Sequence, residues 1–370
     1  MNSKERILTA LKCKTPDRVP VSTYELDNAP VNNTWERRQP AFTKLMDFIE
    51  TRCDLFLPSG IRWVDPSQEK NLVITTRKEG IHTFTEVIWK TPKGDLIKKT
   101  RADEGIGTVW TLEHFVKTDE DIERILSVPL SAEKVNCFHL KESEKILGDR
   151  GVLFVGFDDP LCIAAEILEF GEFTVRVFTD FERIKLLMDR LHERQTYILG
   201  EALKQLKGMN AVIRLVGPEY ATPPYMPPEM FHKLVCEYDK TYIRMIKEAG
   251  FMTRVHSHGK IAKVLDHFLE LGADALDPVE PPTQGDITLS DAKKKCAGRM
   301  CLCGGVELVD LENGTPQSVE KLVKDCMEQA KSEGGYIILP TACPINSDLS
   351  PKTEQNYYAF IESAIKYGGY

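Results

Sequence analysis

The chain has 370 residues, of which 42% are hydrophobic and 28% charged, and its formal net charge is -8. These values are typical of a globular protein, and no apolar run approaches the roughly 18 residues that a membrane-spanning helix needs. The charges form no basic stripe, which argues against nucleic acid as the main partner. The ten cysteines lack the dense spacing of a secreted disulfide scaffold, so we expect reduced thiols and a cytoplasmic protein.

Short apolar runs alternate with longer helical patterns along the chain, as expected for repeated strand–helix units around a parallel sheet. Eight runs are candidate strands: Arg18–Tyr24, Leu55–Leu57, Val152–Phe157, Ala211–Val216, Thr253–His256, Ala273–Leu276, Met300–Cys303 and Tyr336–Leu339. Eight parallel strands predict a closed (β/α)8 barrel, the TIM barrel, as a single domain over residues 1–370.

The pattern changes between the second and the third candidate strand. Residues 71–97 alternate β-branched and polar side chains, and Thr91–Asp95 has the composition of a turn. We therefore expect an antiparallel hairpin region inserted near residues 70–113. Insertions of this kind usually lie over the C-terminal mouth of a barrel and shape the substrate pocket. A flap that only stabilises the barrel is the alternative.

Residues with reactive side chains follow the candidate strands, which is where a TIM barrel builds its active site. Acids, imidazoles and thiols all occur at these strand ends: Asp158 and Asp159, Glu219, His256 and His258, Asp277 and Glu280, Cys303, and Cys343. Because the strands are expected to be parallel, these side chains should converge on one mouth of the barrel.

Two of these residues, His256 and His258, alternate along one strand end and so point in the same direction. Together with Cys343 they form a candidate zinc site, and Glu219 is the candidate for a fourth ligand that substrate displaces. In the alternative interpretation, one histidine binds the metal while the other is a hydrogen-bonded neighbour or a core residue. We expect surface or core positions for the remaining histidines.

Two acids, Glu280 and Asp158, are candidate catalytic residues. Glu280 lies in the proline-rich loop Asp277–Pro282, where it could accept a proton, orient the substrate or hold a ligand histidine. Capping within the loop is the alternative. One of Asp158 and Asp159 is expected to cap the helix that begins near Pro160, while the other faces the pocket.

Six short segments, spread over nearly the whole chain, carry a family resemblance: Glu5–Leu11, Pro16–Val21, Gly217–Tyr220, His256–Gly259, Asp277–Pro282 and Gly334–Tyr336. Together they resemble the uroporphyrinogen decarboxylase superfamily, which implies a (β/α)8 barrel and a choice between two chemistries. True decarboxylases carry an arginine-rich segment soon after the opening motif, where it holds substrate carboxylates. Here acids stand in that place, at Glu25 and Asp27.

The chain is more similar to the second branch, the zinc-dependent methyltransferases that work with a corrinoid. The resemblance implies that His256 and Cys343 bind zinc, and that members of this branch carry a cysteine where this chain has His258. A histidine there keeps a zinc ligand but removes one thiolate, which makes the metal a better Lewis acid. Such a metal suits the activation of an ether or ester oxygen.

The segment Val19–Leu26 also resembles members that demethylate methoxylated aromatic compounds. The implied reaction moves the methyl group to a Co(I) corrinoid, while zinc and a proton donor, Glu280 or Tyr24, stabilise the leaving oxygen. An apolar wall for an aromatic ring could come from three residues after the fourth candidate strand, for which packing is the alternative. The candidate substrate-binding residues are Glu25, Tyr220, Tyr225 and Met226.

The function that we expect is transfer of a methyl group from a small methylated substrate to a corrinoid on a separate protein. No corrinoid-binding module is evident in the sequence, so this partner would dock transiently over the barrel mouth. The resemblance is also compatible with a homodimer. Two alternatives stay open: metal-independent decarboxylation of a small or tetrapyrrole acid by Asp158 and its neighbours, and a metal-binding scaffold without catalysis.

Overall fold

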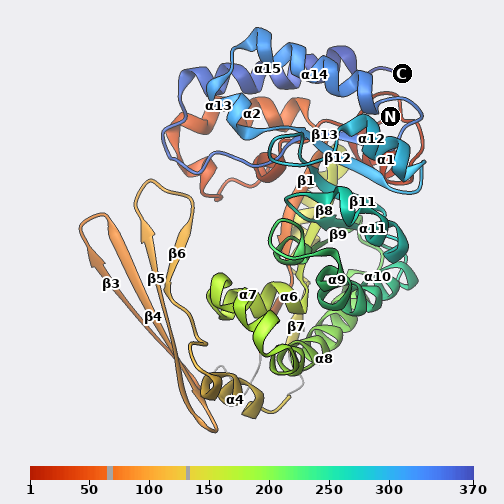
Figure 1. Cartoon of the computed structure of the whole chain (residues 1–370). Coiled ribbons are helices and arrows are strands. Elements are labelled where there is room, and N and C mark those ends of the chain that lie inside the picture. The colour runs from red at the N-terminus through yellow and green to blue at the C-terminus, as the bar shows by residue number, and fades with distance from the viewer. Residues whose placement is uncertain (65–69, 131–133) are drawn as a thin grey trace.

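The computed structural model describes residues 1–64, 70–130 and 134–370. Within these ranges a curled parallel sheet of seven strands forms the centre of the molecule, and helices pack around its outer side (Figure 1). Its strands are, in spatial order, β1 (Leu55–Gly60), β8 (Gly151–Asp158), β9 (Ala211–Val216), β10 (Met252–His256), β11 (Ala275–Val279), β12 (Cys301–Val306) and β13 (Tyr336–Pro340). Spatial and chain order agree, which is the topology of a TIM-barrel-like fold.

The strands form where the sequence has apolar runs, because both of their faces are covered. One face packs against the helices. The other face encloses a separate apolar cluster inside the curled sheet, and helix α1 (Ser3–Leu11) closes one end of it. The residues of this inner cluster are Ile7, Ala10, Leu11, Phe56, Val152, Phe154, Val212, Ala275, Cys301, Cys303, Ile337 and Leu339.

Helices connect successive strands of the sheet. They are α6 (Pro160–Ile167), α7 (Phe170–Thr179) and α8 (Phe181–Leu206) after β8, α9 (Pro228–Phe231) and α10 (Glu237–Glu248) after β9, α11 (Leu265–Leu271) after β10, α12 (Leu289–Cys296) after β11, α13 (Leu308–Asn313) and α14 (Pro316–Ala330) after β12, and α15 (Pro351–Tyr367) after β13. None of the helices in the described ranges is long and apolar enough to cross a membrane.

Three of these helices begin with the same pair of residues, a capping side chain followed by a proline. Asp159, Thr315 and Ser350 each accept a hydrogen bond from the first turn of α6, α14 and α15, and a proline follows each of them. Such a capping side chain satisfies a free N–H group, and proline at the first helical position suits the required backbone angle. This pair therefore sets where each loop at the mouth ends. Asp159 takes the capping position that was expected for one of the two neighbouring aspartates.

The segment Arg18–Tyr24, predicted as the first of the eight strands, is not a strand. It makes a single parallel bridge, between Val21 and Ile338 of β13, and its far side accepts a hydrogen bond from the backbone N–H of Asp54. Pro20 has no N–H group to donate, and aspartate side chains bind the N–H groups of Val21 and Thr23. The segment thus fills the gap between β13 and β1 without forming a regular ladder.

A buried ion-pair cluster around Asp54 holds the start of this segment. The carboxylate of Asp54 accepts hydrogen bonds from Nη1 of Arg6 at 2.6 Å, from Nη1 of Arg18 at 2.7 Å and from the backbone N–H of Val21 at 2.9 Å. Asp54 is fully buried, and a buried carboxylate is stable only where its oxygens are bound in this way. The cluster therefore connects α1, the segment Arg18–Tyr24 and the residue before β1.

A second buried acid, Asp27, holds the end of the segment. Its oxygens accept hydrogen bonds from the hydroxyl groups of Ser22 and Thr23, at 2.6 and 2.8 Å, and from the backbone N–H groups of Thr23 and Phe56, at 2.7 and 3.0 Å. The chain then turns into the 3₁₀ helix η1 (Tyr24–Asn28). The position of Tyr24 at the mouth therefore depends on Asp27.

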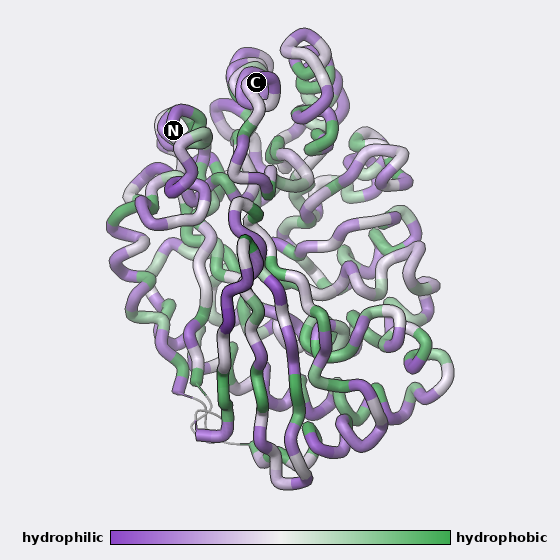
Figure 2. The backbone as a smooth tube through the Cα atoms, turned by 90° about the vertical axis from the view of Figure 1, so that its left-hand side faces the viewer, coloured by the Kyte–Doolittle hydropathy of each residue, from purple (hydrophilic) through white to green (hydrophobic). Residues whose placement is uncertain are grey.

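The insertion after β1 is larger than one hairpin. An antiparallel sheet of β3 (Leu72–Glu79), β4 (His82–Thr91), β5 (Gly94–Asp103) and β6 (Val109–Glu113) projects from the body as an arm (Figure 1). Hydrophilic and hydrophobic stretches are mixed along its strands (Figure 2), and β3 is exposed over its whole length. Helices α2 (Thr43–Arg52), α4 (Asp119–Ser127) and α5 (Leu140–Leu147) and the pair β2 (Arg62–Val64) and β7 (Lys134–Asn136) flank the insertion in sequence.

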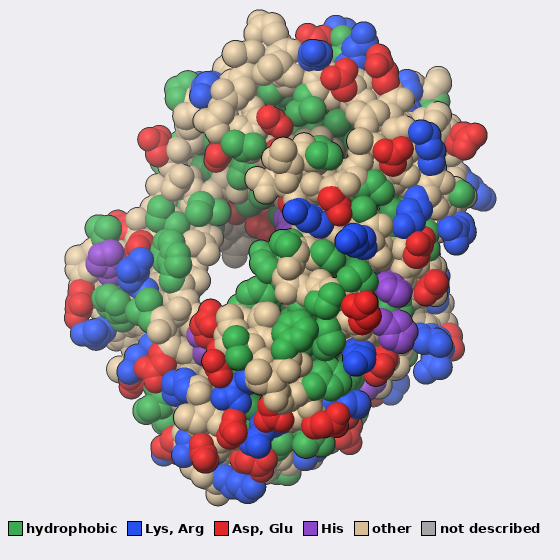
Figure 3. Space-filling view, viewed as in Figure 1, with side chains coloured by type: hydrophobic (Ala, Val, Ile, Leu, Met, Phe, Trp, Pro, Cys, Tyr) green, Lys and Arg blue, Asp and Glu red, His purple; other side chains and the backbone are tan. Residues whose placement is uncertain are grey.

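The arm contacts the loop that follows β13. The backbone N–H of Gly107 donates to the carbonyl of Ile345 at 2.6 Å, and the N–H of Ser347 donates to the carbonyl of Gly105 at 2.8 Å. Figure 3 shows a hollow between the arm and the body, with apolar side chains gathered around it. The arm therefore shapes the space in front of the mouth and anchors the loop that carries Cys343.

Replacing Asp54 with alanine is expected to lower the free energy of unfolding by about 3–5 kcal/mol, because Arg6 and Arg18 lose their buried counter-ion. Urea denaturation followed by circular dichroism measures this change. Asp149→Ala is the matched control, since Asp149 pairs with Lys4 at the surface and is 67% exposed. Its loss should cost about 1 kcal/mol or less. Equal effects of the two substitutions would contradict the closing function of Asp54.

Candidate functional site

The side chains of Glu219, His256 and His258 converge at the C-terminal end of the sheet. Their ligand atoms all lie within 4.8 Å of one another. His256 is the last residue of β10, His258 follows it, and Glu219 lies in the short helix η5 (Pro218–Ala221) directly after β9. Since β9 and β10 are parallel neighbours, residues almost 40 positions apart reach the same point. We refer to these three residues as the metal group.

Each histidine of the metal group contacts a carboxylate through one ring nitrogen. Nδ1 of His258 lies 2.8 Å from Oε1 of Glu280, and Nδ1 of His256 lies 3.3 Å from Oδ2 of Asp277. When Nδ1–H donates to a carboxylate, Nε2 carries the lone pair that binds a metal, and zinc-binding histidines are commonly held in this way. The loop Asp277–Pro282 thus supplies the partners of both imidazoles.

The two histidines have opposite electrostatic surroundings. Burial, reinforced by the positive charge of Arg214, lowers the pKa of His256. Burial alone would also lower the pKa of His258, but the hydrogen bond and the charge of Glu280 outweigh it and raise this pKa. Burial would raise the pKa of Glu280, yet His258 and the N–H of Gly259 hold it below its ordinary value. Glu280 is therefore an ionised partner of His258.

Glu219 has an oxygen that the described protein atoms leave without a hydrogen bond. Oε2 is buried, and Nε2 of His256 lies 3.4 Å from it. An unpaired buried oxygen is costly, and a bound cation would supply the missing contact. Two imidazoles and one carboxylate form a donor set that zinc accepts, with a position left open for substrate. The residues of the metal group therefore fit a zinc ion.

Cys343, the predicted sulfur ligand, lies in the loop after β13. Among the described residues, the group that meets the 4.8 Å spacing does not include it. Its Sγ lies 3.4 Å from Oε2 of Glu25, to which it donates a hydrogen bond. Burial and the charge of Glu25 raise the pKa of the thiol. In this arrangement Cys343 is a protonated donor, and it would have to leave Glu25 before it could bind a metal.

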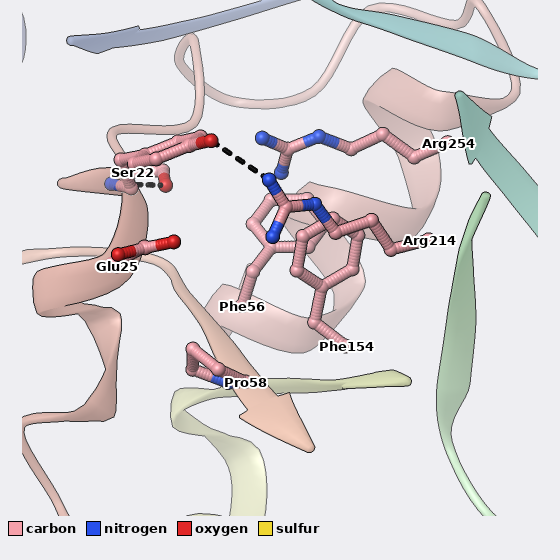
Figure 4. Close-up of a pocket in the computed structure, with 8 residues that line it drawn as sticks. Ser22, Glu25, Phe56, Pro58, Phe154, Arg214 and Arg254 are labelled. Carbon is pink, nitrogen blue, oxygen red and sulfur yellow. Dashed lines mark hydrogen bonds between the residues drawn. The ribbon is translucent and has the colours of Figure 1, made fainter. Parts of the chain in front are cut away.

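Tyr24 lines a narrow pocket, which Figure 4 shows, and its hydroxyl group also lies near His256 of the metal group. Its hydroxyl oxygen accepts a hydrogen bond from Nη2 of Arg214 at 2.7 Å and lies 3.4 Å from Nε2 of His256. Burial raises the pKa of Tyr24, and the charge of Arg214 offsets this only in part. The hydroxyl therefore keeps its proton. The pocket is lined by Ser22, Tyr24, Glu25, Phe56, Pro58, Phe154, Arg214 and Arg254.

Asp158, the other candidate acid, ends β8 and is exposed, whereas its neighbour Asp159 is fully buried. Loss of hydration among the surrounding atoms raises the pKa of Asp158, and the charge of Arg214 partly opposes this shift. Asp158 thus lies at the C-terminal end of the sheet, but neither the metal group nor the pocket beside Tyr24 includes it.

Three of the predicted substrate-binding residues lie in the loop after β9. The rings of Tyr220 and Tyr225 pack against Phe170 of α7 at centroid distances of 5.4 and 5.0 Å. Tyr225 is 55% exposed, so an apolar surface is open to a ligand there. Met226 is only 1% exposed and packs in the main core, in accordance with the packing alternative. The fourth residue, Glu25, lines the pocket beside Tyr24.

The sequence interpretation did not include Arg214, Arg254 or Glu307. The two arginines interrupt apolar runs that became β9 and β10, and a charge in such a position is a signal of a buried polar site. Glu307 follows β12, accepts a hydrogen bond from Thr341 at 2.8 Å and keeps a buried oxygen without a partner. The position of Glu307 after a predicted strand was the sequence signal that could have identified it as a site residue.

The family described as Uroporphyrinogen decarboxylase (URO-D) matches residues 111–366. Among solved structures, a methyltransferase from Methanosarcina mazei has a TM-score of 0.59 at 16% identity, over 99% of both chains. A pneumococcal GH20 module of StrH (TM-score 0.35, 11% identity, 68% of both chains) and a GH5-4 endoglucanase from Bacteroides salanitronis (0.34, 8%, 70% of this chain and 79% of the other) are too distant to carry an argument. A comparison with curated proteins found no match. At 16% identity, the first likeness supports the fold alone.

Glu280→Gln is expected to lower the pKa of His258 in the metal-free protein, because glutamine keeps an acceptor but removes the negative charge. Proton NMR of the imidazole measures both titrations, and the pKa of His258 in the native protein should lie above the ordinary value of a histidine. A proton competes with a metal for the imidazole, so the zinc affinity of the native protein should fall as the pH is lowered through this raised pKa. Glu270→Gln, beside His267, is the control that should leave His258 unchanged. Identical titrations in the native protein and Glu280→Gln would contradict the assignment.

Proposed function

Since the chain belongs to the uroporphyrinogen decarboxylase (URO-D) family, we propose that it is a zinc-dependent methyltransferase. It would move a methyl group from a small methylated substrate to the Co(I) corrinoid of a partner protein. The observation that carries the proposal is the metal group, in which two imidazoles held by carboxylates and an unpaired carboxylate oxygen converge at the mouth. Methoxylated aromatic compounds are the substrate class that we favour.

The residues of the metal group have different tasks in this proposal. His256 and His258 are fixed by Asp277 and Glu280, so they are the permanent ligands. Glu219 has no comparable support and is the ligand that a substrate oxygen would displace. Zinc held there supplies Lewis-acid chemistry toward the oxygen that bears the methyl group. Cys343 completes the site if its loop moves the thiol away from Glu25.

Tyr24 is the residue that we propose as hydrogen-bond donor to the leaving oxygen. Because Arg214 donates to its oxygen, the hydroxyl proton of Tyr24 is directed toward Nε2 of His256, and it would become available to a substrate once a metal occupies that nitrogen. The charge of Arg214 also stabilises negative charge that develops on the oxygen side of the breaking bond. Glu280 is ionised and engaged with His258, so it positions that ring and has no proton to give.

The corrinoid-carrying partner would approach from the side of the arm. The hollow in Figure 3 lies between the arm and the body. Its apolar rim suits a protein that binds only transiently.

Decarboxylation of a small acid is the second candidate function, because the family match and the two pocket arginines both favour it. In that reaction Asp158, whose pKa is raised, would supply a proton to the carbon that loses carbon dioxide. If the metal-free protein released carbon dioxide from a small acid as fast as the zinc-loaded protein, decarboxylation would be favoured over methyl transfer.

The zinc content of the purified protein tests the metal group. We expect about one zinc per chain by elemental analysis, and a loss of affinity of about 10- to 100-fold or more in His256→Ala and His258→Ala. Glu219→Gln should bind zinc more weakly but still detectably. His232→Ala is the control on a helix surface and should retain the metal. A metal-free native protein that also fails to take up added zinc would overturn the proposal.

Tyr24→Phe is expected to reduce methyl transfer about 100-fold or more while the zinc content stays unchanged, because only the proton donor is lost. The change in the absorption spectrum of Co(I) corrinoid, with a panel of methoxylated aromatic donors, measures the rate. Tyr358→Phe is the control, since Tyr358 bonds Glu354 on the surface helix α15. An unchanged rate in Tyr24→Phe would exclude Tyr24 as the donor.

A further inference from the structure

Two arginines from neighbouring strands extend into the pocket beside Tyr24. Arg214 of β9 and Arg254 of β10 are partners in the parallel register, so their side chains leave the sheet side by side (Figure 4). The guanidinium of Arg254 lies 4.6 Å from the ring centre of Phe56 and 4.5 Å from that of Phe154. Arg214 lies 5.7 Å from the ring of Phe154. The phenyl rings cover the faces of the guanidinium groups and leave their N–H edges to find acceptors.

The side chain of Arg254 has more N–H donors than the surrounding protein has acceptors for them. The side chain is 1% exposed, and its Nη2 donates to Asp277 at 2.9 Å. Its Nε and Nη1 are buried and have no hydrogen-bond partner among the described residues. Arg254 and Asp277 form a buried ion pair, so the charge of Arg254 is neutralised by Asp277. The unused N–H groups remain unsatisfied, which is costly at a buried site.

Arg214 lacks a counter-ion in the described part of the chain, where no carboxylate lies within 4.0 Å of it. Its Nη2 donates to the hydroxyl of Tyr24, which is uncharged, and its Nε is buried without a partner. Two acids of this region form hydrogen bonds with other residues: Asp277 accepts from Arg254, and Glu25 accepts from Cys343. The pocket therefore carries one positive charge that the protein does not neutralise by direct contact.

A planar guanidinium with free N–H groups and an unneutralised charge is the usual receptor for a carboxylate. We infer that Arg214, with the unused donors of Arg254, binds a carboxylate of the substrate, so that the methyl donor is a small methylated carboxylic acid. This inference rests on the proposed methyl transfer for the identity of the donor. The binding of a carboxylate at these arginines does not depend on it.

Tyr24 sets the size of this substrate. Its hydroxyl contacts Arg214 on one side and His256 on the other, so the carboxylate subsite and the metal group are separated by a single hydroxyl group. The substrate must place its carboxylate at the arginines and its methyl-bearing oxygen at Glu219. A compact acid meets this requirement, whereas a second carboxylate would be repelled by Glu25, which also lines the pocket.

Calorimetric binding of acids and their amides to the zinc-loaded full chain tests the inference. Methoxyacetate and the methoxybenzoates are compared with the corresponding amides, which keep the shape but lack the charge. The native protein should bind at least one acid about tenfold or more tightly than its amide, because hydrogen bonds between charged groups are stronger. Arg214→Gln should remove this preference, and Arg214→Lys should retain a part of it.

Arg299→Gln is the matched control, because Arg299 is exposed and bonds only backbone carbonyls of its own helix end in the described structure. It should keep the preference for the acid. Equal binding of acid and amide by the native protein, binding of neither across the panel, or an unchanged preference in Arg214→Gln would each overturn the inference. The comparison of acid with amide in the native protein does not require any variant to fold.

The outcomes separate this inference from the proposed function. If acids bind in an Arg214-dependent manner but no methyl group reaches Co(I) corrinoid, the carboxylate subsite stands and the methyltransferase proposal fails. If neutral methoxylated donors react as well as the acids, and Arg214→Gln reacts equally with both, methyl transfer stands and the subsite fails.

Discussion

Two buried aspartates make the site possible, because they hold the segment that closes the sheet. Asp54 binds the beginning of this segment together with Arg6 and Arg18, and Asp27 binds its end through hydroxyl and backbone groups. A regular strand would have satisfied the same N–H groups with backbone carbonyls. The carboxylates do so instead, which leaves the chain free to turn and to place Tyr24 in the mouth.

The mouth separates its charges into two adjoining regions. On one side, Asp277, Glu280 and Glu219 surround the two imidazoles and favour a cation. On the other side, Arg214 and Arg254 present donors that favour an anion. Asp277 belongs to both regions, because it binds Arg254 and His256 with the same oxygen. A ligand with a negative end and a metal-binding oxygen would match this arrangement.

Much of the fold could be predicted from the sequence, because strands that are covered on both faces must be apolar. Each of the six runs between Val152 and Leu339 overlaps a strand of the sheet, although Ala273–Leu276 and Met300–Cys303 begin one or two residues before β11 and β12. The segment Arg18–Tyr24 was predicted wrongly. Val19, Val21 and Tyr24 have strand character, but Pro20, the nearby Asp27 and the distant Asp54 decide its backbone. The bounds of the arm agree with the predicted insertion near residues 70–113, but its four strands were described as a hairpin region, because exposed strands such as β3 lack the apolar pattern that marks a strand.

For the site, the sequence by itself determined the donor types and their order along the chain. Glu219, His256, His258 and Glu280 follow apolar runs, and parallel strands must bring such residues to one mouth. Only the tertiary structure decided which of them meet. It placed the carboxylates on the histidines, set Cys343 against Glu25, and paired Arg214 with Tyr24 across 190 positions. Distances between side chains depend on strand register and loop geometry, which no local sequence pattern contains.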